Sequence, residues 1–482
     1  MRIIARLLIC FSWIALLSTC DANFSMLNKL EQIKQKGIIK ILTRIDPTTY
    51  YEGPDGYKGL EYDLALLFAE HLGVEAHFVI PETFDGILTR ISRGKGDIAA
   101  AGLTITKERQ QVMRFSLPYD EITEQLIYRT DKRRPKDIPS LSGGVFEIVK
   151  GTSHEQTLLD NQQTFPELEW DINSYLDTNA LLYLVNEGLI DYTLADSNQL
   201  QLLQRIYPKL EIAFDISEPR RLAWALENSR DSSLYDEVNS FFSLIKQNKT
   251  LEQLLERHYG HANVLSYQGN CTFRRHIRQR LPKYQTHFMN AADQYHLDWR
   301  LLAAIGYQES RWLKDTTSPT GVKGLMMLTN ITASEMGISN RTDPYQSIEG
   351  GAHYFSLTID KIPTPIPEPD RTWFALAAYN VGKAHVEDAR ILTAQQGSNP
   401  DKWVDVKKRL PLLSQPKWHK KTRHGYARGN EATRYVENIR SYFDLLVWLT
   451  EENIIEKNAM QIEPPEPELK TPPIMPMLPQ AL

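Results

Sequence analysis

The pattern of hydrophobic and polar positions changes near the middle of the 482-residue chain. Between about Gly37 and Gly260, short β-rich runs alternate with stretches of helical spacing. Residues 38–42 predict a strand, and residues 60–72 predict a helix that Gly73 ends. Further strand-like runs cover residues 97–103, 144–149 and 189–195. Strands interleaved with helices indicate an α/β domain, expected over residues 37–262, with mostly parallel sheets.

Residues 283–452 show helical patterns and turn signals with hardly any strand pattern, which predicts a second, all-α domain. Its stronger predicted helices cover residues 299–313, 348–361, 371–381 and 431–449. We expect residues 263–282 to link the two domains. Seven prolines lie between Pro464 and Pro479, so residues 460–482 are expected to form a flexible, extended tail.

The composition is that of a folded protein, because 42% of the residues are hydrophobic and 24% are charged. No apolar run approaches the roughly 20 residues of a membrane span, which excludes a multispan membrane protein. The formal net charge of −5 gives no general argument for nucleic-acid binding. Three cysteines cannot build a disulfide framework or a cysteine-based zinc site.

The first 20 residues have the layout of a secretory signal. Arg2 and Arg6 precede an apolar run over residues 7–17, and small polar residues follow it. The sequence before Cys20 is close to a bacterial lipoprotein signal, although Thr19 is an imperfect residue before the cut. Lipid anchoring at Cys20, simple cleavage of the signal and a retained membrane-lying anchor are all open. In each case the chain is expected to be exported.

A carboxylate lies within an apolar helical stripe of the second domain. Apolar residues at three- and four-residue spacing form the stripe: Leu302, Ile305 and Trp312. The same spacing places Glu309 on their face of the helix, which we expect Asp298 to cap. Removal from water raises the pKa of such a carboxyl group and lets it hold a proton near neutral pH, as a general acid must. A glutamate at the edge of the stripe, paired with an arginine, is the alternative.

Three further segments follow this helix. They are a glycine-punctuated turn at residues 321–327, an Ala-Tyr-Asn segment at residues 377–382 and a Tyr-Val pair within residues 431–436. With the Glu-Ser pair at residues 309–310, they resemble the lytic murein transglycosylase domain related to goose-type lysozyme. The resemblance covers about residues 284–449 and implies a lysozyme-like helical fold.

The resemblance carries catalytic and supporting roles over to six positions: Glu309, Ser310, Met327, Tyr379, Asn380 and Tyr435. Glu309 takes the catalytic acid position, and Asn380 and Tyr435 fall on positions that flank the cleft. Met327 stands where many relatives have glutamine, which puts a polar contact to the sugar in doubt.

The implied chemistry needs one carboxyl group, whereas ordinary glycosidases pair two. The resemblance implies that Glu309 protonates the oxygen between N-acetylmuramic acid and N-acetylglucosamine. As a carboxylate, it then takes the proton from the C6 hydroxyl of the muramic residue, which closes onto C1 and leaves a 1,6-anhydro end. We expect Tyr435 to hold Glu309 by a hydrogen bond and Asn380 to position the sugar. No metal and no organic cofactor is expected.

Residues 56–64, 96–98 and 115–119 carry a second resemblance. Over about residues 37–260, the chain is similar to the periplasmic polar amino-acid-binding proteins of ABC importers. This resemblance implies a two-lobed α/β fold with a hinged cleft.

In that family an arginine clamps the carboxylate of the ligand, because a guanidinium group can donate two hydrogen bonds to it. Arg109 falls on that position, and Thr104 and Thr152 would add hydrogen bonds. Asp196 falls where an acidic residue receives the ammonium group of the ligand, and Tyr50 falls where an aromatic ring covers its side chain. The alternative is a fold kept as a scaffold, with Arg109 in an ordinary surface ion pair.

Two basic clusters lie outside these motifs, at residues 274–280 and 417–428. A solvated surface is the default interpretation of such clusters. Anionic glycan is the alternative partner, and no nucleic acid is expected behind a secretion signal.

The order of the two domains resembles the membrane-bound lytic murein transglycosylases. It implies peptidoglycan glycan strands as the substrate and a place at the inner, periplasmic face of the outer membrane. A muropeptide or amino-acid effector is expected to close the first cleft and alter access to Glu309. A hydrolase on the same fold and a non-catalytic receptor for cell-wall fragments are the rival interpretations.

Overall fold

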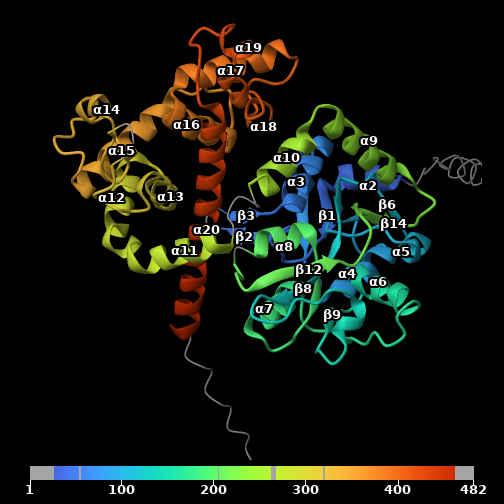
Figure 1. The fold of residues 1–482 in the computed structure, drawn as a ribbon. Coiled ribbons are helices and arrows are strands. Elements are labelled where there is room, and N and C mark those ends of the chain that lie inside the picture. Colours follow the sequence, from blue (N-terminus) through green and yellow to red (C-terminus); the bar gives the residue numbers. More distant parts are fainter. Residues whose placement is uncertain (1–26, 54–55, 205, 262–266, 318–320, 462–482) are drawn as a thin grey trace, which may run out of the picture.

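The computed structural model describes residues 27–53, 56–204, 206–261, 267–317 and 321–461, with side chains as far as Thr450. The predicted signal segment with Cys20 and nearly all of the predicted tail lie outside these residues. Figure 1 shows an α/β body and a helical body, with the long helix α20 (Gly429–Gln461) running between them. The predicted order of an α/β domain and a helical domain is confirmed. Within the described ranges, no helix combines the length and the apolar character needed to cross a bilayer.

The first lobe of the α/β body is built on a five-stranded sheet with the order β4-β1-β5-β14-β6. β1, β4 and β5 are parallel, and β14 runs antiparallel to β5 and β6. The strands are β1 (Ile38–Leu42), β4 (Glu75–Val79), β5 (Ile98–Ala99), β6 (Met113–Phe115) and β14 (Ala225–Glu227). The helices of this lobe are α2 (Lys29–Lys36), α3 (Leu60–Leu72), α4 (Phe84–Ser92), α5 (Lys107–Val112), α9 (Ser233–Gln247) and α10 (Thr250–Tyr259). A small hairpin joins β2 (Tyr51–Gly53) and β3 (Gly56–Lys58).

Two sequence predictions for this lobe match the structure residue for residue. β1 spans the expected strand, and α3 spans the expected helix. Gly73 ends α3 with a left-handed φ of 71°, and its N–H group donates to carbonyl oxygens of the last turn. Phe68, Trp224 and Phe242 fill the space between α3, α9 and the sheet and are completely buried.

The second lobe contains an antiparallel three-stranded sheet with the order β11-β8-β12 and a parallel pair, β9 and β10. Its strands are β8 (Glu124–Arg129), β9 (Glu147–Val149), β10 (Asp171–Asn173), β11 (Thr193–Asp196) and β12 (Leu210–Asp215). Its helices are α6 (Ser153–Gln162), α7 (Thr178–Glu187) and α8 (Ser197–Leu203). The expectation of mostly parallel sheets is wrong for this lobe. Two antiparallel strands, β7 (Asp120–Ile122) and β13 (Arg220–Leu222), cross between the lobes. Because the chain runs from β7 into β8 and from β12 into β13, β8 and β12 are antiparallel as well.

The regular elements among the described residues of the second domain are all helices, joined by turns and loops. Its α-helices are α11 (Tyr267–Gln279), α12 (Gln285–Tyr295), α13 (Trp299–Ser310), α14 (Asn330–Glu335), α15 (Pro344–Asp360), α16 (Asp370–Val381), α17 (Lys383–Gln395), α18 (Trp403–Val406), α19 (Pro416–His419) and α20. α13 is the central helix, and its residues from Leu302 to Ile305 are completely buried. A row of glycine and alanine positions along it allows the surrounding helices to approach closely.

The stretch that the sequence analysis treats as a linker is mostly helix α11. Its Phe273 is completely buried and contacts the rings of Tyr307, Trp312 and Tyr442. This part of the chain therefore contributes to the core of the helical domain. On another face of α11, Arg274 donates a 2.7 Å hydrogen bond to the carbonyl oxygen of Ile206 in the second lobe.

A buried charge cluster joins the first lobe to the helical domain. Arg440 of α20, 1% exposed, donates to Glu256 Oε1 of α10 at 2.7 Å and to the carbonyl oxygens of Glu256 and Arg257 at 3.1 and 3.0 Å. Lys407 donates to the same carboxylate at 3.0 Å. Burial alone would raise the pKa of Glu256, but Arg440 and Lys407 hold it below its ordinary value. Glu256 is therefore ionised at neutral pH, and the helical domain contacts both lobes.

We expect Arg440→Ala to lower the free energy of unfolding by roughly 3–5 kcal/mol, because it leaves a buried carboxylate with half of its positive partners. Urea unfolding followed by circular dichroism measures the change. The matched control is Lys408→Ala, which breaks an ion pair with Glu252 across the same interface. The Lys408 and Glu252 side chains are nearly half exposed, at 49% and 44%. The control substitution should therefore lower the free energy of unfolding by at most about 1 kcal/mol. Equal effects of the two substitutions would contradict the interpretation.

Candidate functional site

Glu309 lies in the last turn of α13. As expected, Asp298 caps the helix, with its carboxylate accepting a 2.7 Å hydrogen bond from the backbone N–H of Arg300. The expected apolar stripe is correct for Leu302 and Ile305, which precede Glu309 on the same face and are completely buried.

Trp312 does not continue this stripe. The helix ends at Ser310, and both Arg311 and Trp312 have left-handed backbone angles, with φ of 53° and 56°. Trp312 turns back and is buried elsewhere in the core, where its indole N–H donates to the carbonyl oxygen of Ala303 at 2.9 Å. The predicted helix over residues 299–313 is therefore three residues too long, because this helix end carries no glycine or proline as a stop signal.

Ser310 links the end of α13 to the glycine turn by a hydrogen bond. Its hydroxyl donates a 2.9 Å hydrogen bond to the carbonyl oxygen of Leu325. Gly324 has a φ of 91°, and a Cβ atom there would lie 1.9 Å from the carbonyl oxygen of Arg341, so only glycine fits. Met327, half-buried with a φ of 50°, closes the turn. The Glu-Ser pair and the glycine turn are thus parts of one rigid unit.

Two tyrosines flank this unit. The Tyr435 hydroxyl lies 2.6 Å from Glu309 Oε1, which is the hydrogen bond expected from the sequence. The Tyr379 hydroxyl donates to the carbonyl oxygen of Met326 at 3.1 Å. Burial, followed by the nearby charge of Glu309, raises the pKa of both phenols well above the ordinary value, so both remain hydrogen-bond donors at neutral pH.

Burial raises the pKa of Glu309 from 4.5 to about 7, although the hydrogen bond from Tyr435 acts in the opposite direction. This carboxyl group therefore holds a proton at pH values where an ordinary glutamate is ionised. The alternative of a salt-bridged edge glutamate does not describe this side chain, whose polar partner is a phenol.

A polar pocket of about 310 Å³ opens beside Tyr435. Its lining comes from α13, α16 and α20: Gln308, Asn380, Asn430, Glu431, Arg434, Tyr435 and Asn438. The pocket thus brings Asn380 and Tyr435 together, as expected. Gln308 and Asn438 also line it, although the sequence analysis does not identify them. Asn438 Nδ2 donates to Gln308 Oε1 at 3.0 Å and fixes the residue next to Glu309. Amide and hydroxyl groups suit a sugar, which offers hydroxyl and acetamido groups.

A second, smaller cavity lies between the lobes of the α/β body. Its lining is Arg44, Phe84, Gly102, Thr104, Arg109, Thr152, Ser153, His154, Thr178, Asp196 and Gln199. Four of the five residues expected from the sequence meet there. Tyr50 does not line this cavity, because its ring stacks on Tyr57 at 4.7 Å and also contacts Tyr62 and Phe78.

Arg109 is 8% exposed, which contradicts the alternative of an ordinary surface ion pair. Its guanidinium group donates to the carbonyl oxygens of Thr104 at 2.8 Å and Gly151 at 2.9 Å. Burial lowers its pKa to about 10, so it remains a cation at neutral pH. The two carbonyl contacts use part of its five N–H donors and orient the rest.

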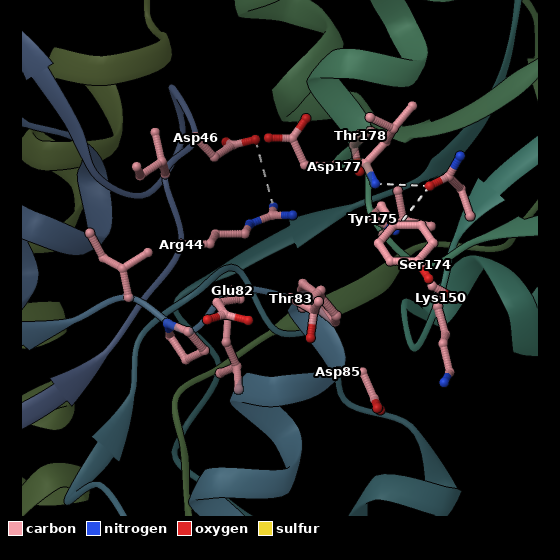
Figure 2. Close-up of a pocket in the computed structure, with 18 residues that line it drawn as sticks. Arg44, Asp46, Glu82, Thr83, Asp85, Lys150, Ser174, Tyr175, Asp177 and Thr178 are labelled. Atoms are coloured by element: carbon pink, nitrogen blue, oxygen red, sulfur yellow. Dashed lines mark hydrogen bonds and ion pairs between the residues drawn. The ribbon is translucent and has the colours of Figure 1, made fainter. Parts of the chain in front are cut away.

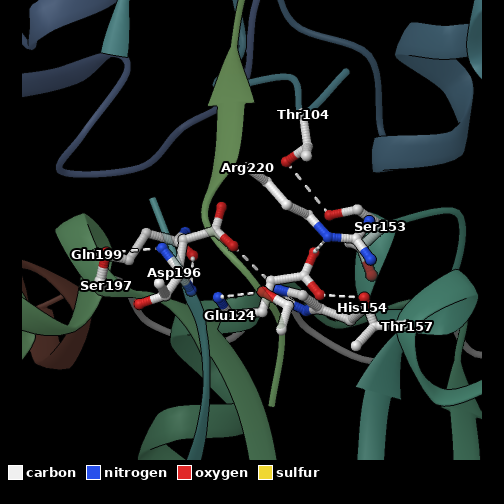
Figure 3. A network of polar contacts seen from close by, with 12 residues as sticks. Thr104, Glu124, Ser153, His154, Thr157, Asp196, Ser197, Gln199 and Arg220 are labelled. Carbon is white, nitrogen blue, oxygen red and sulfur yellow. Dashed lines mark hydrogen bonds and ion pairs between the residues drawn. The ribbon is translucent and has the colours of Figure 1, made fainter. Parts of the chain in front are cut away.

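Figure 3 shows the polar network on the floor of this cavity. His154 Nε2 lies 3.1 Å from Asp196 Oδ1, and Glu124 accepts the hydroxyl of Thr157. In the described part of the chain, Glu124, His154 and Asp196 form one group whose donor atoms, within 4.8 Å of one another, could hold a metal ion. Arg220 lies 3.9 Å from Glu124, and Arg109 faces both carboxylates, so these cations already offset the two negative charges.

The small cavity continues into a cleft of about 430 Å³ between the lobes. Arg44, Phe84 and Thr178 line both spaces. Figure 2 shows Arg44 and Asp46 on one side of the cleft, and Tyr175 and Thr178 of the other lobe across from them. The Tyr175 side chain is 93% exposed at the rim. The cleft therefore offers charged and aromatic groups beyond the arginine site.

Comparisons with known proteins agree with both halves of the chain. Residues 39–261 match the bacterial extracellular solute-binding proteins of family 3, and residues 286–401 match the transglycosylase SLT domain. Among solved structures, arginine-bound truncated ArgBP from T. maritima shares 25% identity, covers 44% of this chain and 99% of its own, and has a TM-score of 0.40. An ancestral amino acid-binding protein, a precursor of cyclohexadienyl dehydratase, shares 26% identity, covers 48% of this chain and 99% of its own, and has a TM-score of 0.43.

Curated relatives extend over nearly the whole chain. A membrane-bound lytic murein transglycosylase F from Pseudomonas fluorescens is 47% identical over 88% of this chain and 87% of the relative. One from Saccharophagus degradans is 46% identical over 90% of this chain and 85% of the relative. With both domains present in the same order, the chain belongs to the membrane-bound lytic murein transglycosylase F family.

Proposed function

We propose that this chain cleaves the β-1,4 bond between N-acetylmuramic acid and N-acetylglucosamine in peptidoglycan, with Glu309 as acid and then as base. Its family makes it a lytic murein transglycosylase, an enzyme that acts on peptidoglycan. The observation that carries the assignment of Glu309 is its pKa of about 7 beside the Tyr435 hydroxyl, next to a pocket lined with polar groups.

In the first step, the neutral carboxylic acid of Glu309 donates its proton to the glycosidic oxygen, and the bond from that oxygen to C1 of the muramic residue breaks. The N-acetylglucosamine leaves with a free hydroxyl, and C1 becomes electron-deficient. A pKa near the working pH makes this transfer efficient. The Tyr435 O–H group donates to the carboxylate as its negative charge appears.

In the second step, the Glu309 carboxylate accepts the proton of the muramic C6 hydroxyl. The C6 oxygen forms a bond to C1 and closes the 1,6-anhydro ring, so no water is consumed. Glu309 ends protonated, as it began. One group suffices because its two tasks follow each other at the same face of the sugar.

The other motif residues support this cycle. We assign Asn380, at the pocket, to contact with the sugar. Ser310 and Tyr379 act as positioning residues, since both donate to carbonyl oxygens of the glycine turn. Met327 offers the substrate apolar surface where glutamine would offer an amide.

A hydrolase remains the rival for the same site, because the pocket contains one more carboxylate. Glu431 lines it, is exposed, and lies 3.6 Å from Arg428. An inverting hydrolase would need such a group as a base that activates water. The family, whose members are named lytic murein transglycosylases, favours the transglycosylase.

For the α/β body, we propose an amino-acid or muropeptide effector. Arg109 would receive a carboxylate, Thr104 and Thr152 would add hydrogen bonds, and Asp196 with its neighbour His154 would receive an ammonium group. The cleft of about 430 Å³ favours a short peptide over a single amino acid, because the arginine site itself leaves little free space.

The contacts between the domains support a regulatory role for this effector. The helical domain is bonded to the first lobe through Arg440 and to the second lobe through Arg274. Closure of the cleft moves the lobes relative to each other, so at least one of these contacts must adjust. Arg440 follows Tyr435 by five residues on the same helix, and a shift of α20 therefore reaches Glu309.

Since the relatives are membrane-bound, we propose attachment at the periplasmic face of the outer membrane after export. Cys20 is the candidate residue for a lipid anchor.

Mass spectrometry of purified peptidoglycan after digestion tests the reaction. We expect 1,6-anhydro-muropeptides from the wild-type protein and a rate at least about a hundredfold lower for Glu309→Gln, which cannot transfer a proton. Reducing-end products, abolished by Glu431→Gln, would establish the hydrolase. A folded wild-type protein that cleaves nothing, with or without stem peptides, would establish the receptor.

The pH dependence of kcat/KM tests the role of Tyr435. Activity should fall as the pH rises through about 7, because the acid form of Glu309 is lost. Tyr435→Phe removes a hydrogen bond that lowers this pKa, so the alkaline limb should move to higher pH while the maximal rate falls about tenfold or more. If the substitution lowers the rate but does not move the alkaline limb of the pH profile, Tyr435 has a purely structural role.

Isothermal titration with free stem tripeptide and tetrapeptide, together with the cleavage rate, tests the effector site. Arg109→Ala should weaken binding at least about tenfold and abolish the effect of the peptide on the rate. Lys132→Ala is the matched control, because Lys132 is an exposed cation of the second lobe that lines neither the cleft nor the arginine site. If the peptide binds yet leaves the rate unchanged in both the wild type and Arg109→Ala, the regulatory role is wrong.

A further inference from the structure

The basic cluster at residues 417–428, here called the basic loop, directly precedes α20 in the helical domain. Its exposed cations are Lys417, Lys420, Lys421, Arg423 and Arg428. It contains no acidic residue, although the whole chain has a net charge of −5. Within the part of the chain that the structure describes, the one ion pair of these cations joins Arg428 to Glu431 at 3.6 Å, with both side chains 65% exposed. Such an exposed ion pair contributes little stability, so the positive charges of the basic loop are available to a partner.

A buried carboxylate holds the backbone of the basic loop. Asp388 of α17 is 1% exposed and accepts hydrogen bonds from the backbone N–H groups of Arg423 at 3.2 Å and His424 at 2.9 Å. The N–H group of Ala427 donates to the carbonyl oxygen of Leu413 at 3.2 Å. The cations are thus carried by an ordered scaffold, and little entropy is lost when they bind a partner.

Aromatic rings lie among the cations. Lys417 and Lys421 place their ammonium groups 5.3 and 5.8 Å from the centre of the Trp418 ring. Tyr426 is 57% exposed, with the ring of His419 set edge-on at 5.8 Å. A partner with carboxylates and short apolar side chains, such as a peptide, fits this mixture.

The basic loop adjoins the pocket beside Glu309 from two directions. His424 contacts the ring of His385 at 6.3 Å, and His385 lies in the first turn of α17, which follows Asn380 after two residues. At the other end, Arg428 directly precedes α20, whose Asn430 and Glu431 line the pocket. A glycan strand in the pocket would therefore carry its substituents over the basic loop.

We propose that the basic loop binds the carboxylates of the stem peptides on the peptidoglycan strand that Glu309 cleaves. The glycan itself is uncharged, because its sugars carry acetamido groups and the lactyl carboxyl is bound to the peptide, so charge complementarity selects the peptides. The position beside the pocket favours this partner over an anionic membrane surface. The inference rests on the proposed function, from which the following experiment separates it.

The test measures binding without cleavage, in the full chain carrying Glu309→Gln. One variant adds K417Q, K420Q and K421Q. Its matched control adds K132Q, R133Q and K136Q, which removes the same charge from an exposed segment of the second lobe. Co-sedimentation at several salt concentrations is measured with intact sacculi, with sacculi whose stem-peptide carboxylates have been converted to neutral amides, and with phosphatidylglycerol vesicles. Equal unfolding temperatures of the variants verify their fold.

The expected result is about tenfold weaker binding of the basic-loop variant to intact sacculi, since three exposed charge contacts each contribute about 0.5 kcal/mol. Salt should weaken binding of the control more steeply than binding of the variant, and both should bind the amidated sacculi equally. Equal binding of both to intact sacculi overturns the inference, as does an equal loss on amidated sacculi. A loss confined to the vesicles overturns it in favour of a membrane surface. If the wild-type protein cleaves no peptidoglycan, the proposed function fails while these binding results still decide the role of the basic loop.

Discussion

The exclusion of water from one carboxyl group is the constraint on which the helical domain is built. Glu309 has a pKa near neutrality because apolar residues of α13 precede it and α20 covers it, and its polar partner is a phenol that cannot ionise there. Keeping an acid neutral in this way requires the helix that carries it to be central and completely packed. The burial of Leu302 to Ile305 and the bond from Ser310 to the glycine turn both serve this end. The same packing leaves open the side that faces the polar pocket.

The site in the α/β body contains several charged groups, in contrast to the site of the helical domain, which is built around one buried carboxyl group. Cations and carboxylates gather at the cavity of the α/β body, where Arg109 lies near Glu124 and Asp196, and Arg220 lies 3.9 Å from Glu124. Such a set of paired charges is satisfied when the cleft is empty and can exchange partners with a zwitterionic ligand at small net cost. Glu309 therefore keeps its proton because water is excluded from it, whereas the binding site combines cations with carboxylates.

Local signals allowed much of this to be predicted from the sequence. A strand and a helix of the first lobe match residue for residue, because Gly37 and Gly73 punctuate an unambiguous hydrophobic pattern. The Glu-Ser helix and its partner Tyr435 were found because the motifs are short and ordered along the chain. The antiparallel sheet of the second lobe was missed, since strand direction depends on how the chain crosses between the lobes and not on any local residue. Tyr50 does not line the cavity for a related reason, because its ring packs against three aromatic rings that no local signal connects with it. Gln308 and Asn438 lacked a motif, and only the crossing of α13 and α20 brings them together.

The guanidinium group of Arg440 has a consequence for how the chain is made. It donates to two carbonyl oxygens in the last turn of α10, which is the closing helix of the α/β body, so a side chain of the second domain completes the end of a helix in the first. Arg440 follows Glu256 by 184 residues, and Ser441 likewise donates to the carbonyl oxygen of His261. A ribosome must therefore synthesise the entire catalytic domain before the binding domain acquires its last hydrogen bonds. The boundary between the domains in the sequence is therefore not a boundary in folding, and a binding domain excised at residue 261 would lack the guanidinium group that binds the last turn of its closing helix.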